Sequence, residues 1–218
     1  MLREFPRRTF LKTALAAVPA ATLAKPSSLL AQLRLSQPDE MLFKISLAQW
    51  SLNRALFGGE LDNLDFPVVT RQEYGLDAVE YVNQFFKDKA EEEDYLSEMT
   101  KRAEDNGVQS LLIMCDGEGH LGDPDANMRT QAVENHHKWV RAAKYLGCHS
   151  IRGTFGAPCP LSGNYEEQTR LAVDGLRRLG ELCAADGVNA IIENHGGMSA
   201  HAGWLASVIK EVDLPNCG

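Results

Sequence analysis

The chain has 218 residues, of which 44% are apolar, 24% charged and 7% aromatic, so collagen-like, low-complexity and largely disordered proteins are excluded. Lys and Arg total 22 against 30 Asp and Glu, and the formal net charge is -8. Nucleic acid is therefore disfavoured as a partner, because its phosphates bind basic surfaces. The five cysteines are odd in number and form no CxxC pair, so neither a disulfide framework nor a zinc ribbon is indicated.

Residues 1–31 have the composition of an export signal rather than of a folded domain. They carry Arg-Arg-Thr-Phe-Leu-Lys at residues 7–12, followed by an alanine-rich, weakly apolar run over 13–24. That run is too short to span a hydrocarbon core of ~30 Å as a helix, so no stable membrane anchor is expected. The paired arginines resemble the twin-arginine signal, which implies export to the periplasm or the exterior, with residues 32–42 as a linker. The alternative is an amphipathic N-terminal helix of a cytoplasmic protein, although the segment lacks a polar face.

A repeating unit of helix, glycine and short apolar run fills residues 43–218. Gly75, Gly107, Gly147 and Gly187 each follow a polar, helix-periodic segment and precede an apolar run directly. Glycine just past a helix end adopts the left-handed conformation that ends the helix, and a continuous apolar run is typical of a strand buried on both faces. The pattern predicts helices that alternate with parallel strands.

The expected elements follow one another in regular alternation. Strands are predicted near 43–50, 76–82, 108–114, 148–154 and 188–193, and helices near 62–74, 89–106, 126–146, 165–186 and 202–212. Asn164 is expected to cap the fourth helix, with Glu167 as its return partner. The residues of that helix that share an apolar stripe are Ala172, Leu176, Leu179 and Cys183.

Two architectures fit such a sheet, an open doubly wound sheet and a closed (β/α)8 barrel. The glycine-rich phosphate turn of a nucleotide-binding domain is replaced here by Gln49-Trp50-Ser51-Leu52-Asn53, which favours the barrel. A complete barrel takes about 250 residues and eight strands. The predicted fold is an α/β TIM barrel that is incomplete here, with about five of eight strand-helix units. A sixth strand is expected to begin near 214–218, and the chain is expected to be C-terminally truncated.

The strongest candidate for chemistry is the end of the last predicted strand, where Glu193 and His195 follow an apolar run. Working groups of such barrels lie at the carboxyl ends of the strands. His195 points to the same side as Glu193 if the strand continues. An unpaired ionised carboxylate there is costly, so a cation or a cluster of donors is implied. Glu193 suits Mn, Mg or Zn as a hard oxygen ligand. The alternatives are an ion pair for Glu193 and a hydrogen-bonded loop position for His195.

Other residues at strand ends are candidates for substrate binding. Glu80 ends the second strand and fits either a sugar hydroxyl or a structural network. Arg152 ends the fourth strand and fits an anionic or polyhydroxyl ligand, or a salt bridge to Glu193 or Glu80. Trp50 follows the first strand, and His120, in the loop after the third strand, is a candidate substrate contact.

The acidic segment at 116–125 does not have the ligand spacing of an EF-hand and is interpreted as an active-site loop. Asp123 is expected to cap the next helix, with Pro124 in its first turn. His136 and His137 are adjacent within a helix, so they diverge by ~100° and do not easily hold one ion. Both are expected at the surface.

Four strings on successive predicted strands together resemble the xylose isomerase-like TIM barrels, specifically the sugar phosphate isomerase/epimerase group. They are Ser46-Leu47-Ala48-Gln49-Trp50-Ser51-Leu52, Gly75-Leu76-Asp77-Ala78-Val79-Glu80, Ile151-Arg152 and Ile192-Glu193-Asn194-His195-Gly196-Gly197. The resemblance covers about residues 43–218. It implies one divalent ion held by a glutamate, an aspartate, a histidine and a second glutamate, of which only the first carries over, onto Glu193. Asn194 stands where epimerases often have a proline.

The resemblance implies a metal-dependent isomerase or epimerase that acts on a small-molecule sugar or keto-polyol through an enediolate. Glu193 is then the metal ligand and base, while His195 and Arg152 orient the substrate. A homo-oligomer stays open, and the 218-residue chain alone is expected to be inactive. The alternatives are a sugar dehydratase of the same fold, a noncatalytic exported sugar-binding module, an endonuclease IV-like enzyme, which the acidic charge opposes, and an inactive fragment.

Overall fold

The computed structural model describes residues 43–155 and 164–218. The predicted signal at 1–31, the predicted linker at 32–42 and Cys159 lie outside the described residues. None of the described helices combines the length and the apolar composition that a membrane crossing requires.

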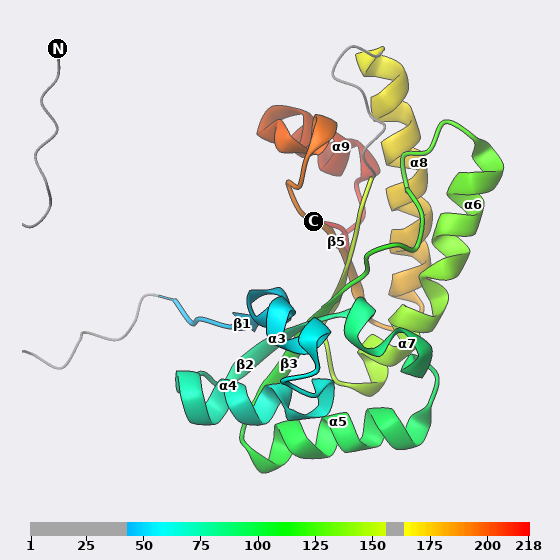
Figure 1. Ribbon diagram of the computed structural model, residues 1–218. Helices are drawn as coiled ribbons and strands as arrows, with labels where there is room; N and C mark the ends of the chain where they lie inside the picture. Colours follow the sequence, from blue (N-terminus) through cyan, green and yellow to red (C-terminus); the bar gives the residue numbers. More distant parts are fainter. Residues whose placement is uncertain (1–42, 156–163) are drawn as a thin grey trace, which may run out of the picture. The chain divides into compact units, whose positions relative to one another are not determined.

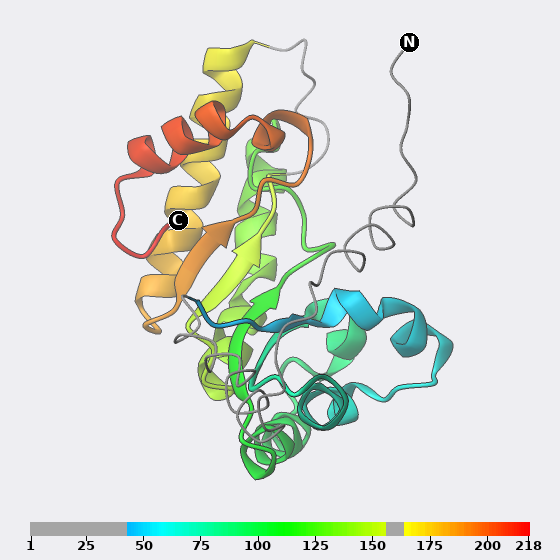
Figure 2. The ribbon, with the colours of Figure 1, turned by 90° about the vertical axis from the view of Figure 1, so that its left-hand side faces the viewer.

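Five parallel strands alternate with helices, in one sheet of order β1-β2-β3-β4-β5 (Figures 1 and 2). The strands are β1 (Leu47–Ala48), β2 (Ala78–Val82), β3 (Gln109–Met114), β4 (Ser150–Gly153) and β5 (Asn189–Ile192). The α-helices are α3 (Asn53–Gly58), α4 (Phe66–Tyr74), α5 (Glu93–Asp105), α6 (Ala126–Asn135), α7 (His137–Tyr145), α8 (Tyr165–Ala184) and α9 (Ala202–Val212). The short 3-10 helices are η1 (Gln49–Leu52), η2 (Asn63–Asp65), η3 (Asn83–Lys89) and η4 (Gly197–Ala200).

Glycines in the left-handed conformation precede four of the strands, as the sequence predicts. Gly75, Gly107, Gly147 and Gly187 have φ angles of 67°, 63°, 72° and 70°, and each strand begins two or three residues later. Other residues reach this region only with strain, so these positions stop the helix and redirect the chain into the sheet.

The structure differs from the predicted elements mainly in their lengths. Every strand is shorter than predicted, and the run at 43–50 gives only the two residues of β1. The helix expected over 126–146 is two helices, α6 and α7, which meet at His136. The sequence analysis also missed α3, because its six residues lack the long apolar stripe of a helix that covers a sheet.

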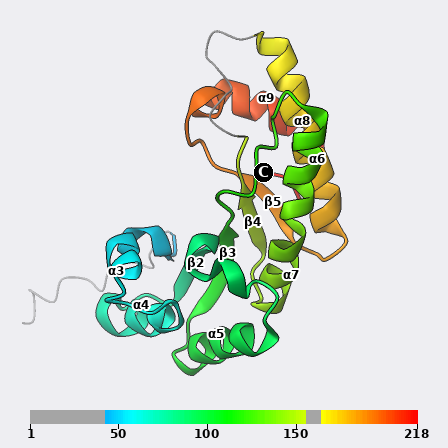
Figure 3. The same cartoon turned by 45° about the vertical axis from the view of Figure 1, so that its right-hand side comes forward.

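The two faces of the sheet have different surroundings. Helices α5, α7 and α8 cover one face (Figure 3). The strand residues that point to it are almost completely buried: Val79, Tyr81, Ile113, Ile151, Ala190 and Ile192. Residues alternate between faces along a strand, so Glu80, Leu112 and Ile191 belong to the opposite face, where they are only partly buried. The polar candidates therefore lie on the less covered face.

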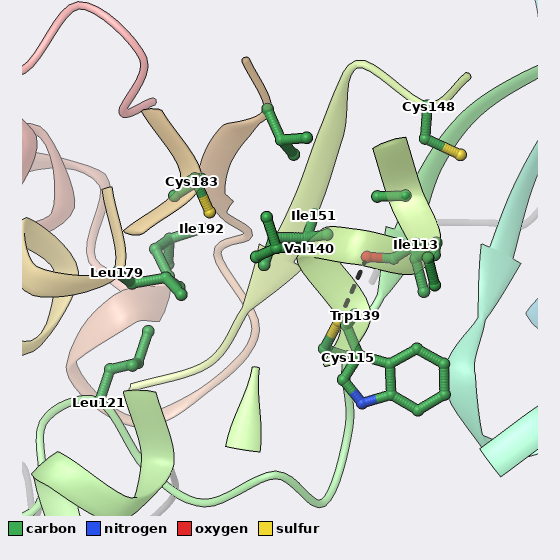
Figure 4. Packing of buried hydrophobic residues seen from close by; sticks show 14 of the residues in the cluster. Ile113, Cys115, Leu121, Trp139, Val140, Cys148, Ile151, Leu179, Cys183 and Ile192 are labelled. Atoms are coloured by element: carbon green, nitrogen blue, oxygen red, sulfur yellow. Dashed lines mark hydrogen bonds between the residues drawn. The ribbon is translucent and has the colours of Figure 1, made fainter. Parts of the chain in front are cut away.

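The core between the sheet and the helices is apolar and well interleaved (Figure 4). Trp139 of α7 is fully buried and packs edge-on against Phe86, with ring centroids 5.3 Å apart. The predicted stripe of α8 is confirmed, because Ala172, Leu176, Leu179 and Cys183 are all inaccessible to solvent. Each large apolar side chain buried in this way contributes roughly 1.5–3 kcal/mol.

Helix caps confirm one prediction and correct two. The Asn164 side chain accepts hydrogen bonds from the backbone N–H groups of Glu166 and Glu167, as expected of an N-cap. The Glu167 carboxylate, predicted to return to the cap, is bonded to Arg170. Asp125, not Asp123, caps α6 by accepting hydrogen bonds from two backbone N–H groups.

His136 also corrects the sequence analysis, since it is fully buried rather than at the surface. Its Nδ1 lies 2.7 Å from the carbonyl oxygen of Ala132, one turn earlier in α6. The α6–α7 junction turns the ring into the core, while the next residue, His137, is exposed as expected. Burial lowers the pKa of His136.

The last residues of the chain pair with β5 in parallel. The backbone N–H groups of Ala190 and Ile192 donate to the carbonyl oxygens of Asn216 and Gly218, each at 2.8 Å. Gly218 returns a hydrogen bond to Ala190 at 3.1 Å. A sixth parallel segment therefore begins where the sequence predicts it.

Candidate functional site

Arg152 occupies a buried position on the less covered face of the sheet. It lies in β4, beside Met114 of β3 and Ile191 of β5, and is 5% exposed. Its Nη1 donates a hydrogen bond to Asp116 Oδ1 at 2.7 Å. A buried guanidinium needs such a counter-charge, because an unpaired charge inside a protein costs several kcal/mol.

Glu193 and His195 follow β5 directly and lie beside Arg152. Glu193 Oε2 lies 3.5 Å from Arg152 Nε and 3.8 Å from His195 Nδ1, so both side chains face the same way. The side chain of Glu193 is 50% exposed. The positive partner that the sequence analysis required for this carboxylate is thus present in the chain, and it is Arg152.

These residues line a pocket of about 330 Å³ at the carboxyl ends of the strands, called the central pocket here. Its wall is formed by Ala48, Trp50, Ser51, Val82, Met114, Asp116, Arg152, Glu193 and His195. A second pocket of about 190 Å³ shares Glu193 and His195 and is completed by His120, Thr154, Phe155, Gly196, Gly197 and Ser199. Volumes of this size match small-molecule sites rather than macromolecular interfaces.

One nitrogen of the arginine fork has no hydrogen-bond partner in the part of the chain that the structure describes. Arg152 Nε is buried, and no hydrogen-bond acceptor meets it at bonding distance and geometry. Glu193 Oε2, at 3.5 Å, is too far for a normal hydrogen bond. A buried donor without an acceptor is costly, so an oxygen bound in the central pocket would gain from this N–H group.

Asn83 holds Asp116 in place; the sequence analysis placed Asp116 in the predicted active-site loop and assigned no role to Asn83. The Asn83 Oδ1 accepts from the backbone N–H of Asp116, and its Nδ2 donates to the Asp116 carbonyl oxygen, both at 2.9 Å. Asn83 Nδ2 also reaches Glu118 at 3.2 Å, and Glu118 pairs with Lys138 at 3.3 Å. A polar residue within two positions of the end of each of two neighbouring strands was the signal available in the sequence.

The loop at 116–125 is packed, which fixes the residues it carries. Its Leu121 and Gly122 N–H groups donate to the carbonyl oxygens of Thr154 and Phe155, at 3.1 and 3.4 Å. Gly175 of α8 lies directly behind it, and a Cβ added there would lie 1.9 Å from the Leu121 carbonyl oxygen. The loop can sit this close to α8 only because that position has no side chain.

The remaining candidates are placed differently. Trp50 lines the central pocket, and His120 lines the second pocket, where its Nδ1 is buried without a hydrogen-bond partner. Glu80 lines neither pocket and accepts a hydrogen bond of 2.6 Å from Ser46. The structure thus brings Trp50, Arg152, Glu193 and His195 together, while Glu80 lies deeper in the sheet.

Thiol chemistry is disfavoured at this edge. Cys115, directly after β3, is buried, and its Sγ points back to the Ile113 carbonyl oxygen at 3.7 Å (Figure 4). Burial raises the pKa of this thiol well above its usual value. It therefore stays protonated and is a poor nucleophile.

A divalent metal ion fits the described residues only in part. Glu193 offers a carboxylate oxygen and His195 an imidazole nitrogen on the same side of the pocket, which are suitable donors for Mn, Mg or Zn. Within residues 43–155 and 164–218, no three His, Cys, Asp or Glu side chains come together as a metal site requires. Arg152, a permanent cation, also competes for the Glu193 carboxylate.

Comparisons with known proteins agree with this geometry. The model of the family described as "Xylose isomerase-like TIM barrel" matches residues 71–218. The chain is similar in fold to D-psicose 3-epimerase from Clostridium cellulolyticum H10, at a TM-score of 0.65, 17% identity, and coverage of 80% of this chain and 62% of that one. No protein of curated function matches the chain.

Two further solved structures share the fold. A probable 3-DHS dehydratase from Bacillus anthracis matches with a TM-score of 0.64 and 19% identity, over 80% of this chain and 61% of that one. The IOLI protein with a bound zinc atom matches with a TM-score of 0.62 and 14% identity, over 81% and 61%. The chain thus spans about six-tenths of the length of the solved structures it matches.

Proposed function

This chain belongs to the xylose isomerase-like TIM barrel family, and on that premise we propose that it isomerises or epimerises a sugar or keto-polyol by proton transfer through an enediolate. The observation that carries the proposal is the half-exposed Glu193 carboxylate, held in the pocket wall between Arg152 and His195. An epimerase and a probable dehydratase among chains of the same fold support a sugar-modifying reaction.

Three side chains have separate roles in this reaction. Glu193 takes a proton from the carbon next to the substrate carbonyl, exchanges it with solvent, and another group returns a proton to the enediolate. Arg152 donates its Nε–H to the carbonyl oxygen as negative charge develops there. His195 holds the neighbouring hydroxyl. Return of a proton to the other carbon gives the isomer, and delivery of a proton to the opposite face by a second group gives the epimer. Departure of a β-hydroxyl with a proton, as water, gives a dehydrated product.

The ends of the substrate have different surroundings. Trp50 offers an apolar wall to the C–H groups of the sugar in the central pocket. His120 offers a buried, unpartnered nitrogen to a hydroxyl in the second pocket. We assign Glu80 to the polar network with Ser46 rather than to substrate contact.

We also propose that the reaction depends on a divalent ion, Mn, Mg or Zn, with Glu193 as a ligand. The zinc atom of the IOLI structure supports this proposal by fold alone. When bound, such an ion would lower the cost of forming the enediolate by stabilising its negative charge. The described residues supply at most Glu193 and His195 as donors, so the site requires further ligands from elsewhere.

Export by the twin-arginine route remains part of the proposal and rests on the sequence of residues 1–31. Export separates the protein from phosphorylated metabolites, so a free or oxidised sugar is the substrate class we favour. Replacement of Arg7 and Arg8 by lysine is expected to leave the protein in the cytoplasm when cell fractions are blotted.

Proton transfer is tested by incubating the complete gene product with a panel of ketoses in deuterated water, with Mn, Mg, Zn or a chelator. We expect one deuterium at the carbon next to the carbonyl, detected by NMR. Glu193→Gln keeps the shape of the side chain but not its basicity, and should slow exchange by about 10²–10⁴-fold. Glu134→Gln, an exposed carboxylate on α6, is the matched control and should exchange at the wild-type rate.

The metal is tested separately by the electron paramagnetic resonance spectrum of Mn²⁺. Stoichiometric binding that Glu193→Gln weakens would support a ligand role for the carboxylate. Binding unchanged in that variant would contradict the role. Absence of deuterium from every ketose, with every ion, would exclude isomerisation, epimerisation and dehydration through an enediolate together.

A further inference from the structure

Three aromatic side chains form an exposed cluster next to the central pocket, called the aromatic cluster here. Trp50 of η1, Phe57 of α3 and Phe85 of η3 meet with ring centroids 4.9–6.3 Å apart. Trp50 is 47% and Phe57 60% exposed. Large apolar side chains that gather at the surface mark binding sites more often than isolated ones do.

The aromatic cluster lies beside the central pocket and also beside a separate groove. Trp50 is itself part of the central pocket wall. Phe57 and Phe85 line a groove of about 390 Å³, together with Asp62 and Gln84. The aromatic cluster therefore contributes residues to the walls of both the central pocket and this groove.

A polar contact also joins the groove to the central pocket. Gln84 Nε2 donates to Asp116 Oδ2 at 3.4 Å, and Asp116 is the residue that holds Arg152. Gln84 lies in η3, immediately after Asn83, which holds the Asp116 backbone. A residue of the groove is thus hydrogen-bonded to a carboxylate of the central pocket wall.

We propose that the aromatic cluster binds a second sugar ring, so that the substrate is a glycosidically linked ketose whose reacting unit occupies the central pocket. This inference rests on the proposed function and names its substrate class. A pyranose ring presents C–H groups on its faces and hydroxyls at its rim. The rings of Phe57 and Phe85 match the faces, and the Asp62 carboxylate and Gln84 amide match the rim.

A second copy of the chain is a weaker occupant of this surface. A stable interface buries about 800 Å² on each partner and has an apolar centre. The aromatic cluster is only three rings, and the groove beside it carries a carboxylate and an amide. Its size and mixed chemistry fit a small polar ligand with apolar faces better.

Trp50 provides a direct readout of ligand binding. Of the three tryptophans, Trp139 and Trp204 are buried, so acrylamide quenching of the fluorescence reports on Trp50. The probes are D-fructose and two glucosyl-fructoses, maltulose and isomaltulose, which carry the same ketose with one additional ring. We expect at least one glucosyl-fructose to protect Trp50 at a concentration at least tenfold lower than D-fructose.

The Phe57→Ala variant distinguishes binding of the second sugar ring from binding of the reacting ketose. Phe57 is exposed, so the variant is expected to fold, and it should reduce the preference for the glucosyl-fructose to less than twofold without changing the affinity for D-fructose. Phe57→Tyr should restore the preference. The control is Tyr74→Ala at another exposed aromatic residue, at the end of α4, which should leave all three affinities unchanged.

Three results would overturn the second-ring site. They are protection by neither glucosyl-fructose beyond that by D-fructose, a preference that survives Phe57→Ala, and a Phe57→Ala variant that sediments as a monomer where the wild type is a dimer. Failure of the proposed function has a different signature. In that case no deuterium enters any ketose, while the preference for the linked sugar and its loss in Phe57→Ala persist.

Discussion

Two buried arginines in this molecule have different surroundings. Arg129 of α6 donates its Nε to Asp174 at 2.9 Å and its Nη1 to the carbonyl oxygens of Asp123 and Pro124 at 2.7 and 3.3 Å. Arg152 of β4 bonds Asp116 through Nη1, but its buried Nε has no hydrogen-bond partner. The first guanidinium is satisfied by the fold, whereas the second, which belongs to a residue of the central pocket wall, leaves one buried donor without an acceptor.

The difference separates a structural charge from one that is prepared for a ligand. Arg129 ties the start of α6 to α8, and burial of its charge is compensated within the chain. Arg152 is compensated only in part, and the Glu193 carboxylate beside its free nitrogen is half-exposed. A fold tolerates such an incomplete network where a ligand completes it.

Lysine at each position is the strongest test of this comparison. Lysine keeps the charge but loses the planar fork, so Arg152→Lys should slow ketose exchange about 100-fold or more. Arg129→Lys should change the exchange rate less than threefold, because Arg129 lies in neither pocket. Deuterium incorporation followed by NMR measures both. Equal rates for the two variants would remove the distinction between the arginines.

The loss of stability, in contrast to the loss of exchange rate, should be larger for a substitution at Arg129 than for one at Arg152. Arg129→Met leaves two carbonyl oxygens and the Asp174 carboxylate without their donor, and should lower the free energy of unfolding by about 2 kcal/mol. Asp174 stays partly solvated, which limits the loss. Arg152→Met should cost about 1 kcal/mol, since it removes a single hydrogen bond. Urea denaturation measures both, and a larger loss for Arg152→Met would reverse the assignment.

Substitution of Asn83 should affect both the stability of the protein and the rate of ketose exchange. Asn83→Ala removes the bonds that hold Asp116, so we expect a loss of about 1–2 kcal/mol in stability and about tenfold in exchange rate. Asn216→Ala is the control, because Asn216 donates to the carbonyl oxygens of Gly180 in α8 and of Val188, which directly precedes β5. It should reduce stability similarly and leave exchange unchanged. An unaffected exchange rate in Asn83→Ala would show that Asp116 needs no such support.

The smallest expected effect is the pH dependence of the free energy of unfolding, which arises from a core residue rather than from the candidate site. Burial lowers the pKa of His136, so the unfolded chain binds its proton first as pH falls below about 6.5. The free energy of unfolding should therefore decrease between pH 7.5 and 5.5, by about 1 kcal/mol or less. His136→Gln should flatten this slope in urea titrations at several pH values. An unchanged slope would assign the pH dependence to other groups.

The fold was largely predictable because its signals are local. Glycine after a helical segment and an apolar run after the glycine are visible at Gly75, Gly107, Gly147 and Gly187, and the parallel α/β fold they predict is confirmed by the structure and the family match. The break at His136 was not predictable, since the apolar periodicity continues through α6 and α7. The direction of that ring depends on packing between distant elements.

The candidate site was predictable in part for a related reason. Position at a strand end identified Arg152, Glu193 and His195, which the structure brings together in one pocket. Asn83 was not singled out, and Asp116 was identified only as part of the predicted loop at 116–125, because their role lies in bonds between residues 33 apart in sequence, which no short motif encodes. Their functional roles, like those of the other site residues, stay predictions until exchange is measured.

The absence of a side chain at Gly175 indirectly determines the shape of the second pocket. The helix backbone at that position touches the Leu121 carbonyl, so the substitution of even one methyl group would force the loop away from α8. His120, the preceding residue, would move with it and reshape the second pocket. The shape of the second pocket thus depends on a helix whose residues line neither pocket.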